Sequence, residues 1–233
     1  MVAPVKNPEL TRSTEDSLKT IFELASVTGA AQTNAIADAL AVAPASVSGM
    51  IKRLSESGLL AHVPYKGVQL TETGKRAALR MVRRHRILET YLTSKLGYDW
   101  DSVHQEAERL EHAVSDGLIE RMAMALGNPR HDPHGAPIPT PAGHIEEEDL
   151  VALSEVPEGE LAELRRVSDK NPELLRYLAS LGLKPGVTIE VGVRQPFRGP
   201  LAVRVVGPTP REQVIGHELA EALFCEIVTK EAG

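Results

Sequence analysis

Histidine and glutamate residues recur at helical spacing in the middle of the chain, where they could bind divalent metal ions. His85 and Glu89 are four residues apart, so both project from one face of a helix. A second group recurs at i, i+4, i+7 and i+8 and forms a single stripe, namely His104, Glu108, Glu111 and His112. Imidazole and carboxylate ligands without thiolate suit Mn²⁺ or Fe²⁺ better than Cu⁺ or structural Zn²⁺.

The length of this stripe predicts two metal sites rather than one. At a rise of ~1.5 Å per residue, His104 and Glu111 lie about 10 Å apart along the axis, too far for one ion to bridge. We therefore group His85 and Glu89 with His104, and Glu108 and Glu111 with His112. A solvated polar helix face is the alternative. Because histidine must be deprotonated to bind a metal, we expect binding to weaken as the pH falls toward ~6.5.

The elements upstream follow the pattern of a winged helix-turn-helix. A short helix begins at Thr33, a turn at residues 42–44 leads into a helix over residues 45–57, and a hairpin covers residues 59–71. One face of the second helix is apolar, which leaves the other face free to enter a DNA major groove. The residues expected to touch DNA are Thr33, Ala45, Ser46, Ser48, Gly49, Lys52, Arg53 and, at the hairpin turn, Lys66. A helix pair in a generic bundle is the alternative, and the hairpin with its cationic turn disfavours it.

Composition places the chain among globular proteins of a reducing compartment. It has 233 residues, of which 42% are hydrophobic and 25% charged. The net charge is −6, yet residues 1–76 carry eight basic and seven acidic residues, so the acidic excess lies outside the proposed DNA-binding part. The single cysteine, Cys225, excludes an internal disulfide and is expected in the core. With no apolar run of 18 residues and no signal peptide, we expect a cytoplasmic protein without membrane contact.

The remaining sequence predicts helices, a linker and a small sheet. Long helices are expected over about residues 71–96 and 101–126, followed by a proline-rich linker and a short helix over residues 172–181. Short alternating strands at residues 188–193 and 201–206 predict a small β-barrel as a separate domain. The fold class is therefore mainly α with a small β part.

Four segments carry a resemblance to a known family: residues 44–48 (PASVS), 84–89 (RHRILE), 103–116 and 132–139 (DPHGAPIP). The sequence resembles the diphtheria toxin repressor family of metal-dependent transcription regulators over nearly its whole length. The resemblance implies a homodimer that binds palindromic operator DNA and represses metal-uptake genes when metal is bound. It also implies a winged helix-turn-helix over residues 1–76, a helical metal-binding and dimerisation domain over residues 77–146 with the linker from about residue 129, and an SH3-like domain over residues 147–233.

The resemblance further assigns two metal sites per chain. His85, Glu89 and His104 match the ancillary site, while Glu111 and His112 match the primary site. Iron-responsive members have a methionine and a cysteine where this chain has Asp16 and Glu108, and the manganese-responsive branch has an aspartate and a glutamate there. The resemblance therefore implies Mn²⁺, with Fe²⁺ as the alternative.

Three points of the sequence bear on how closely it follows the family. Without the resemblance, Asp16 would be interpreted as a helix cap or as a partner of the helix dipole. Residues 167–171 lack the ligand pair that the third domain of iron-type members donates, and Asp169 or Asn171 could substitute. The manganese branch typically lacks a third domain, so this chain is expected to be a mixed subtype.

Two other classes of protein compete with this interpretation. The first is a winged-helix regulator of a small organic ligand, which DNA binding in chelator and in Mn²⁺ would distinguish. The second is a hydrolase with a dinuclear metal site, which would need an open coordination position and a general base. No separate nucleophile motif is present, so we expect no enzymatic activity.

Overall fold

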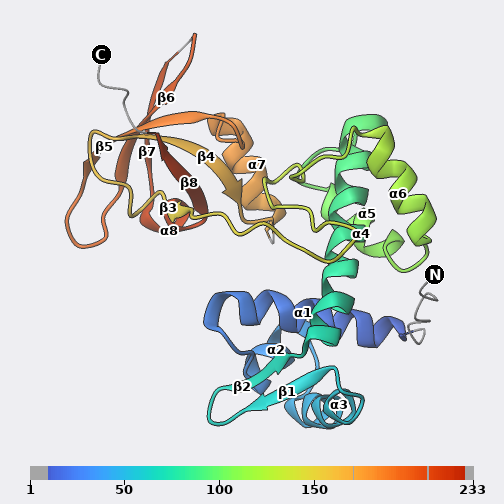
Figure 1. The fold of residues 1–233 in the computed structure, drawn as a ribbon. Coiled ribbons are helices and arrows are strands. Elements are labelled where there is room, and N and C mark those ends of the chain that lie inside the picture. Colours follow the sequence, from blue (N-terminus) through green and yellow to red (C-terminus); the bar gives the residue numbers. More distant parts are fainter. Residues whose placement is uncertain (1–9, 170, 209, 229–233) are drawn as a thin grey trace. The chain divides into compact units, whose positions relative to one another are not determined.

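The computed structural model describes residues 10–169, 171–208 and 210–228, and it is mostly helical with a small antiparallel sheet (Figure 1). The chain divides into two compact units. Residues 1–85 and 139–145 form the first unit, and residues 86–138 and 146–233 form the second. Each unit is described by itself below.

The first unit holds the predicted helix pair and hairpin. Helices α1 (Arg12–Thr28), α2 (Thr33–Leu40) and α3 (Pro44–Glu56) precede a hairpin of β1 (Leu60–Val63) and β2 (Gly67–Leu70), and α4 (Glu72–Leu96) begins here. Apolar faces of the three helices and the hairpin share one core, which includes Leu18, Ile21, Ile36, Val47, Leu54 and Val68. No single described helix is long and apolar enough to cross a membrane; the bent pair α2 and α3 passes that test only by length and composition.

The start of α1 differs in detail from the prediction. Thr11 is the N-cap, and its hydroxyl accepts a hydrogen bond from the backbone N–H of Thr14 at 3.3 Å. Asp16 lies within the helix and is half-buried. The interpretation of Asp16 as a helix cap is therefore wrong.

The helical part of the second unit contains a break that the sequence did not predict. In place of one helix over residues 101–126, the chain forms α5 (Val103–Leu110) and α6 (Asp116–Ala125). Ser115 caps α6 by accepting a hydrogen bond from the backbone N–H of Leu118, which starts a new helix. His112 consequently lies beyond α5, and the histidine–glutamate stripe is not one continuous helix face.

The rest of the second unit is a six-stranded antiparallel sheet with two helices. The strands are β3 (Val151–Ala152), β4 (Leu161–Val167), β5 (Thr188–Arg194), β6 (Leu201–Val206), β7 (Arg211–Ile215) and β8 (Leu223–Val228), and the helices are α7 (Pro172–Leu181) and α8 (His217–Glu221). The strand order is β3-β8-β4-β5-β6-β7. Because β3 and β7 do not pair within the described residues, the sheet is open, whereas the sequence predicted a barrel. Cys225 lies in its core, as predicted, and burial raises the pKa of its thiol to about 12.

Candidate metal centre

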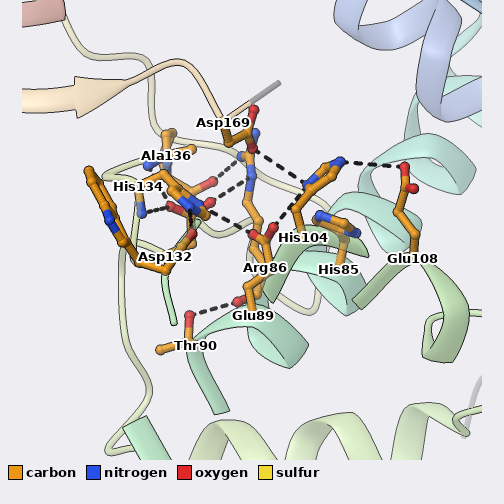
Figure 2. Close-up of polar contacts among 12 residues, drawn as sticks. His85, Arg86, Glu89, Thr90, His104, Glu108, Asp132, His134, Ala136 and Asp169 are labelled. Atoms are coloured by element: carbon orange, nitrogen blue, oxygen red, sulfur yellow. Dashed lines mark hydrogen bonds and ion pairs between the residues drawn. The ribbon is translucent and has the colours of Figure 1, made fainter. Parts of the chain in front are cut away.

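Four metal-ligating side chains from distant parts of the sequence converge in the second unit (Figure 2). Glu89 comes from α4 and His104 from α5, while His134 lies in the linker after α6 and Asp169 in the loop between β4 and α7. The side chains of Glu89 and His134 are fully buried, and those of His104 and Asp169 are 27% and 29% exposed. We call these four residues the linker centre.

The electrostatics around His104 show that the linker centre favours positive charge. Its Nδ1 atom lies 3.0 Å from Glu89 Oε1 and 4.0 Å from Asp169 Oδ2, and its Nε2 atom lies 3.4 Å from Glu108 Oε1. Burial by itself lowers the pKa of His104, but the hydrogen bonds to Glu108 and Glu89 and the charge of Asp169 outweigh it and raise the pKa to about 10. A metal ion that binds His104 must therefore displace a proton even at neutral pH. An ordinary histidine would require this only at pH values near or below ~6.5.

His134 presents a lone pair to the same centre. Its Nε2 atom lies 2.6 Å from the carbonyl oxygen of Trp100, and because a carbonyl only accepts, Nε2 donates this hydrogen bond. In the neutral ring the lone pair then sits on Nδ1, which is buried, finds no hydrogen-bond partner among the described residues and lies 3.9 Å from Glu89 Oε2. Two ligand atoms that are each about 2.0–2.2 Å from one ion lie roughly 3–4 Å apart. The pair therefore fits a shared metal ion.

Asp169 adds a third ligand atom close enough to those of Glu89 and His134 to share one metal ion. One ligand atom each from Glu89, His134 and Asp169 lies within 4.8 Å of the other two. Of the two candidates from the third domain, Asn171 is already engaged, because its side-chain oxygen caps α7 by accepting from the backbone N–H groups of Glu173 and Leu174. Asp169 is thus the residue of that loop that faces the centre.

A tight turn in the linker fixes the position of His134. The Oδ1 atom of Asp132 accepts hydrogen bonds from the backbone N–H groups of His134 at 2.8 Å and Ala136 at 2.9 Å. Gly135 has a φ of +86°, and a Cβ there would lie 1.8 Å from the carbonyl oxygen of Arg165, so only glycine fits. The turn is therefore pressed against β4 with no room for adjustment.

Further contacts hold the same turn from the inside of the unit. The Trp100 ring stacks on the His134 ring with centroids 5.7 Å apart. The Oδ2 atom of Asp132 lies 3.5 Å from Nε of Arg86. Burial, followed by the charge of Glu89, raises the pKa of Asp132 to about 6.

The sequence prediction missed His134 because it lies in a proline-rich segment without helical spacing. The available signal was the Asp-x-His-Gly run at residues 132–135, which is typical of a tight turn.

The structure leaves part of the predicted ancillary site untested. His85 is buried, lies one helical turn before Glu89 on α4, and is the last residue of the first unit. Within that unit, Nζ of Lys19 lies 3.1 Å from Nδ1 of His85. Glu89 and His104 come together as predicted, and participation of His85 beside His104 stays a prediction.

The predicted primary site is brought together only in part. Glu111 is buried, and its Oε1 atom lies 3.7 Å from Nε2 of His112. Glu108 was grouped with these two, but its carboxylate lies beside His104. Asp16 belongs to the first unit, so its joining with Glu111 and His112 stays a prediction.

The predicted DNA-contacting residues all lie in the first unit, and most of them are exposed. On α3, Val47 and Leu54 are buried, while the opposite face exposes Ala45, Ser46, Ser48, Lys52 and Arg53. Gly49 and, on α2, Thr33 are half-buried, and Lys66 is exposed at the hairpin turn. This arrangement is the one that a recognition helix with a neighbouring wing requires. The contacts of the individual residues with DNA stay predictions.

Three segments of the chain each match a known protein family. Residues 9–68 match the N-terminal DNA-binding domain of iron-dependent repressors. Residues 71–140 match the metal-binding and dimerisation domain of the same repressors, and residues 151–227 match the FeoA domain.

Similar proteins include regulators of both iron and manganese. The chain is 30% identical to the iron-dependent repressor IdeR of Mycobacterium bovis over 232 residues, covering 94% of this chain and 99% of that protein. It is 36% identical to the regulator MntR of Lysinibacillus sphaericus over 113 residues, covering 48% of this chain and 81% of that protein. A solved structure of a manganese-dependent transcriptional repressor in complex with manganese is 38% identical, covers 92% of this chain and 100% of that chain, and has a TM-score of 0.84.

Proposed function

Because the chain belongs to the diphtheria toxin repressor family of metal-dependent transcriptional repressors, we propose that Mn²⁺ is the ion that activates it for DNA binding. The observation that carries this proposal is the ligand set of the linker centre, where carboxylate oxygens and imidazole nitrogens meet without sulfur. Such harder ligands favour Mn²⁺ or Fe²⁺ over Cu⁺. The similarity to a repressor that was solved in complex with manganese supports the choice of Mn²⁺.

The second proposed site points to the same metal. We propose that Asp16, Glu108, Glu111 and His112 form it, which gives two metal ions per chain; the carboxylate of Glu108, which lies beside His104 without metal, would have to turn to this site. Asp16 and Glu108 supply oxygen where iron-responsive members have sulfur, which disfavours a preference for Fe²⁺. His85 is proposed as a further ligand beside Glu89 and His104. Fe²⁺ remains the alternative effector.

The mechanism is a linkage between metal binding and the DNA-binding state. A bound ion supplies positive charge that several buried or half-buried carboxylates can share. Glu89, His134 and Asp169 would hold the ion through carboxylate oxygens and the Nδ1 lone pair of His134, and His104 would join them only in its deprotonated form. The ion shifts the protein toward the DNA-binding state only by as much as it binds that state more tightly.

The proposal extends to partners, domains and location. The chain acts as a homodimer on palindromic operator DNA and represses genes of metal uptake, as a cytoplasmic protein. Its domains are a winged helix-turn-helix over residues 1–76, a metal-binding and dimerisation domain over residues 77–146, and an SH3-like domain over residues 147–233. We propose that it is a regulator without enzymatic activity, because its relatives are DNA-binding transcriptional repressors.

The test is to identify the metal that restores DNA binding. The full chain is purified, its metal content is measured by mass spectrometry, and the metal is removed with a chelator. Each of Mn²⁺, Fe²⁺, Co²⁺ and Zn²⁺ is then added back, without oxygen for Fe²⁺, and binding to a duplex selected from a random library is measured. We expect Mn²⁺ to restore binding in the wild type and in Glu155→Gln, which changes an exposed glutamate outside the centre, but far less in Glu89→Gln. Binding that is unaffected by the chelator would contradict the proposal.

A further inference from the structure

The turn of the β1–β2 hairpin carries an aromatic side chain that the fold does not use. Tyr65 is fully exposed and has a φ of +63°. The backbone N–H of Lys66 donates to the carbonyl oxygen of Val63 at 3.1 Å, so residues 63–66 form a β-turn with Pro64 and Tyr65 at its centre. A proline followed by a positive φ is typical of a type II turn, which favours glycine or asparagine where this chain has tyrosine. The chain therefore holds a bulky ring in a strained conformation without any packing to compensate.

The turn is held firmly to the rest of the first unit. Ala31 and Val68 exchange two backbone hydrogen bonds of 2.8 and 3.0 Å, which attach β2 to the segment before α2. A Cβ on Gly67 would lie 2.2 Å from the carbonyl oxygen of Ala31, so the backbones pack in direct contact. The side chain of Gln69 donates to the carbonyl oxygen of Gly29. The hairpin belongs to the same unit as α2 and α3 and is drawn beside them in Figure 1, so the fold sets where the hairpin turn lies relative to α3.

Exposed cationic side chains in the same unit as Tyr65 suit the chemistry of a DNA backbone. Lys66 follows it at the turn, and α3 exposes Lys52 and Arg53. A tyrosine has an apolar ring and a hydroxyl donor, and it is one of the side chains that hydrogen-bond phosphate oxygens. Strained residues that persist without a packing role are concentrated at binding sites.

We propose that Tyr65 contacts the sugar–phosphate backbone of the operator beside the segment that α3 enters. The ring lies against a deoxyribose, and the hydroxyl donates a hydrogen bond to a phosphate oxygen. This proposal rests on the proposed function as a DNA-binding repressor. The contact raises affinity and sets the position of α3, and it does not select bases.

The chain contains a matched control for this residue. Phe197, in the turn between β5 and β6 of the second unit, is also almost fully exposed and has a φ of +58°. Replacement of either aromatic residue by asparagine removes an exposed ring and relieves a similar strain, because asparagine tolerates the left-handed region. Only Tyr65 belongs to the DNA-binding unit.

The experiment compares affinity and stability in the full chain with saturating Mn²⁺. Dissociation constants are measured by fluorescence anisotropy on a duplex that the wild type selects from a random library. We expect Tyr65→Asn to weaken binding about tenfold and Tyr65→Phe, which loses only the hydroxyl, about threefold. Phe197→Asn should bind within about twofold of the wild type. Both asparagine variants should melt about 2 °C higher because the strain is relieved.

Two results would overturn the proposal. The first is wild-type affinity in Tyr65→Asn. The second is weaker binding together with a lower melting temperature, because the loss would then come from a damaged hairpin. Failure of the wild type itself to bind any duplex with Mn²⁺ would instead refute the proposed function. The proposed contact of Tyr65 with DNA would then be refuted as well.

Discussion

Replacement of His134 by glutamine should remove one metal ligand and leave the loop around it in place. The Nε2 amide of glutamine can donate to the carbonyl of Trp100 as the imidazole does, but no atom takes the place of Nδ1. Because Nδ1 is buried 3.9 Å from Glu89 Oε2, water does not readily substitute for it. We expect the linker centre of His134→Gln to bind Mn²⁺ about 100-fold more weakly, which corresponds to about 2.8 kcal/mol.

The same loss should appear in the thermal stability. At a free Mn²⁺ concentration of about 100 times its dissociation constant, the wild type gains about 2.7 kcal/mol from metal binding. The variant, with a dissociation constant near that concentration, gains only about 0.4 kcal/mol. At about 2–4 °C per kcal/mol for a chain of this size, Mn²⁺ should raise the melting temperature of the wild type about 5–9 °C more than that of His134→Gln.

The assay uses the only tryptophan of the chain. The ring of Trp100 stacks on His134 at 5.7 Å, so its fluorescence should respond to Mn²⁺ at the linker centre. The titration is run with wild type, His134→Gln and His144→Gln, which changes an exposed histidine of the first unit, outside the linker centre. Equal Mn²⁺ affinity and an equal thermal shift in wild type and His134→Gln would refute the assignment of Nδ1 as a ligand.

Three further predictions address the turn, the protonation and the metal preference. Gly135→Ala should lower the free energy of unfolding by about 3 kcal/mol or more, because the added Cβ overlaps a backbone carbonyl. Gly159→Ala, at a φ of +82° in open space, should lower it by only about 1–2 kcal/mol. Denaturant unfolding measures both variants, and equal losses would contradict the clash at Gly135. Protons compete with metal at His104, whose pKa is about 10, so Mn²⁺ affinity of the centre should rise about tenfold per pH unit from pH 6.5 to 8.5 in calorimetric titrations, and a flat profile would exclude this competition. Asp16→Met combined with Glu108→Cys should shift activation of DNA binding from Mn²⁺ toward Fe²⁺ under anaerobic conditions, and unchanged selectivity would remove their proposed role.

Local patterns in the sequence were enough to predict the elements that carry much of the proposed chemistry. The alternation of apolar and polar residues identified α3 with Val47 buried and Lys52 exposed, because a helix face repeats every three to four residues. The same periodicity placed His85 and Glu89 on one helix face, four residues apart. These predictions concern neighbours within a helix or a hairpin, which the spacing of residues determines directly.

The features that were missed depend on contacts between distant segments. The lone pair of His134 faces the linker centre only because Trp100 accepts its other N–H, and nothing in the residues around His134 reveals that partner. The break between α5 and α6 comes from the cap at Ser115, which competes with a helical pattern that continues past it. Closure of the sheet into a barrel would need a pairing of β3 with β7, and strand patterns do not encode which edges meet.

The most direct test of the proposed function is the affinity of the full chain for its selected duplex at buffered free Mn²⁺ concentrations from nanomolar to millimolar. If metal binding is linked to the DNA-binding state, the dissociation constant should fall at least tenfold over this range and return to its starting value on chelation. A dissociation constant that stays the same across the whole range would contradict the proposal that this protein is a manganese-activated repressor.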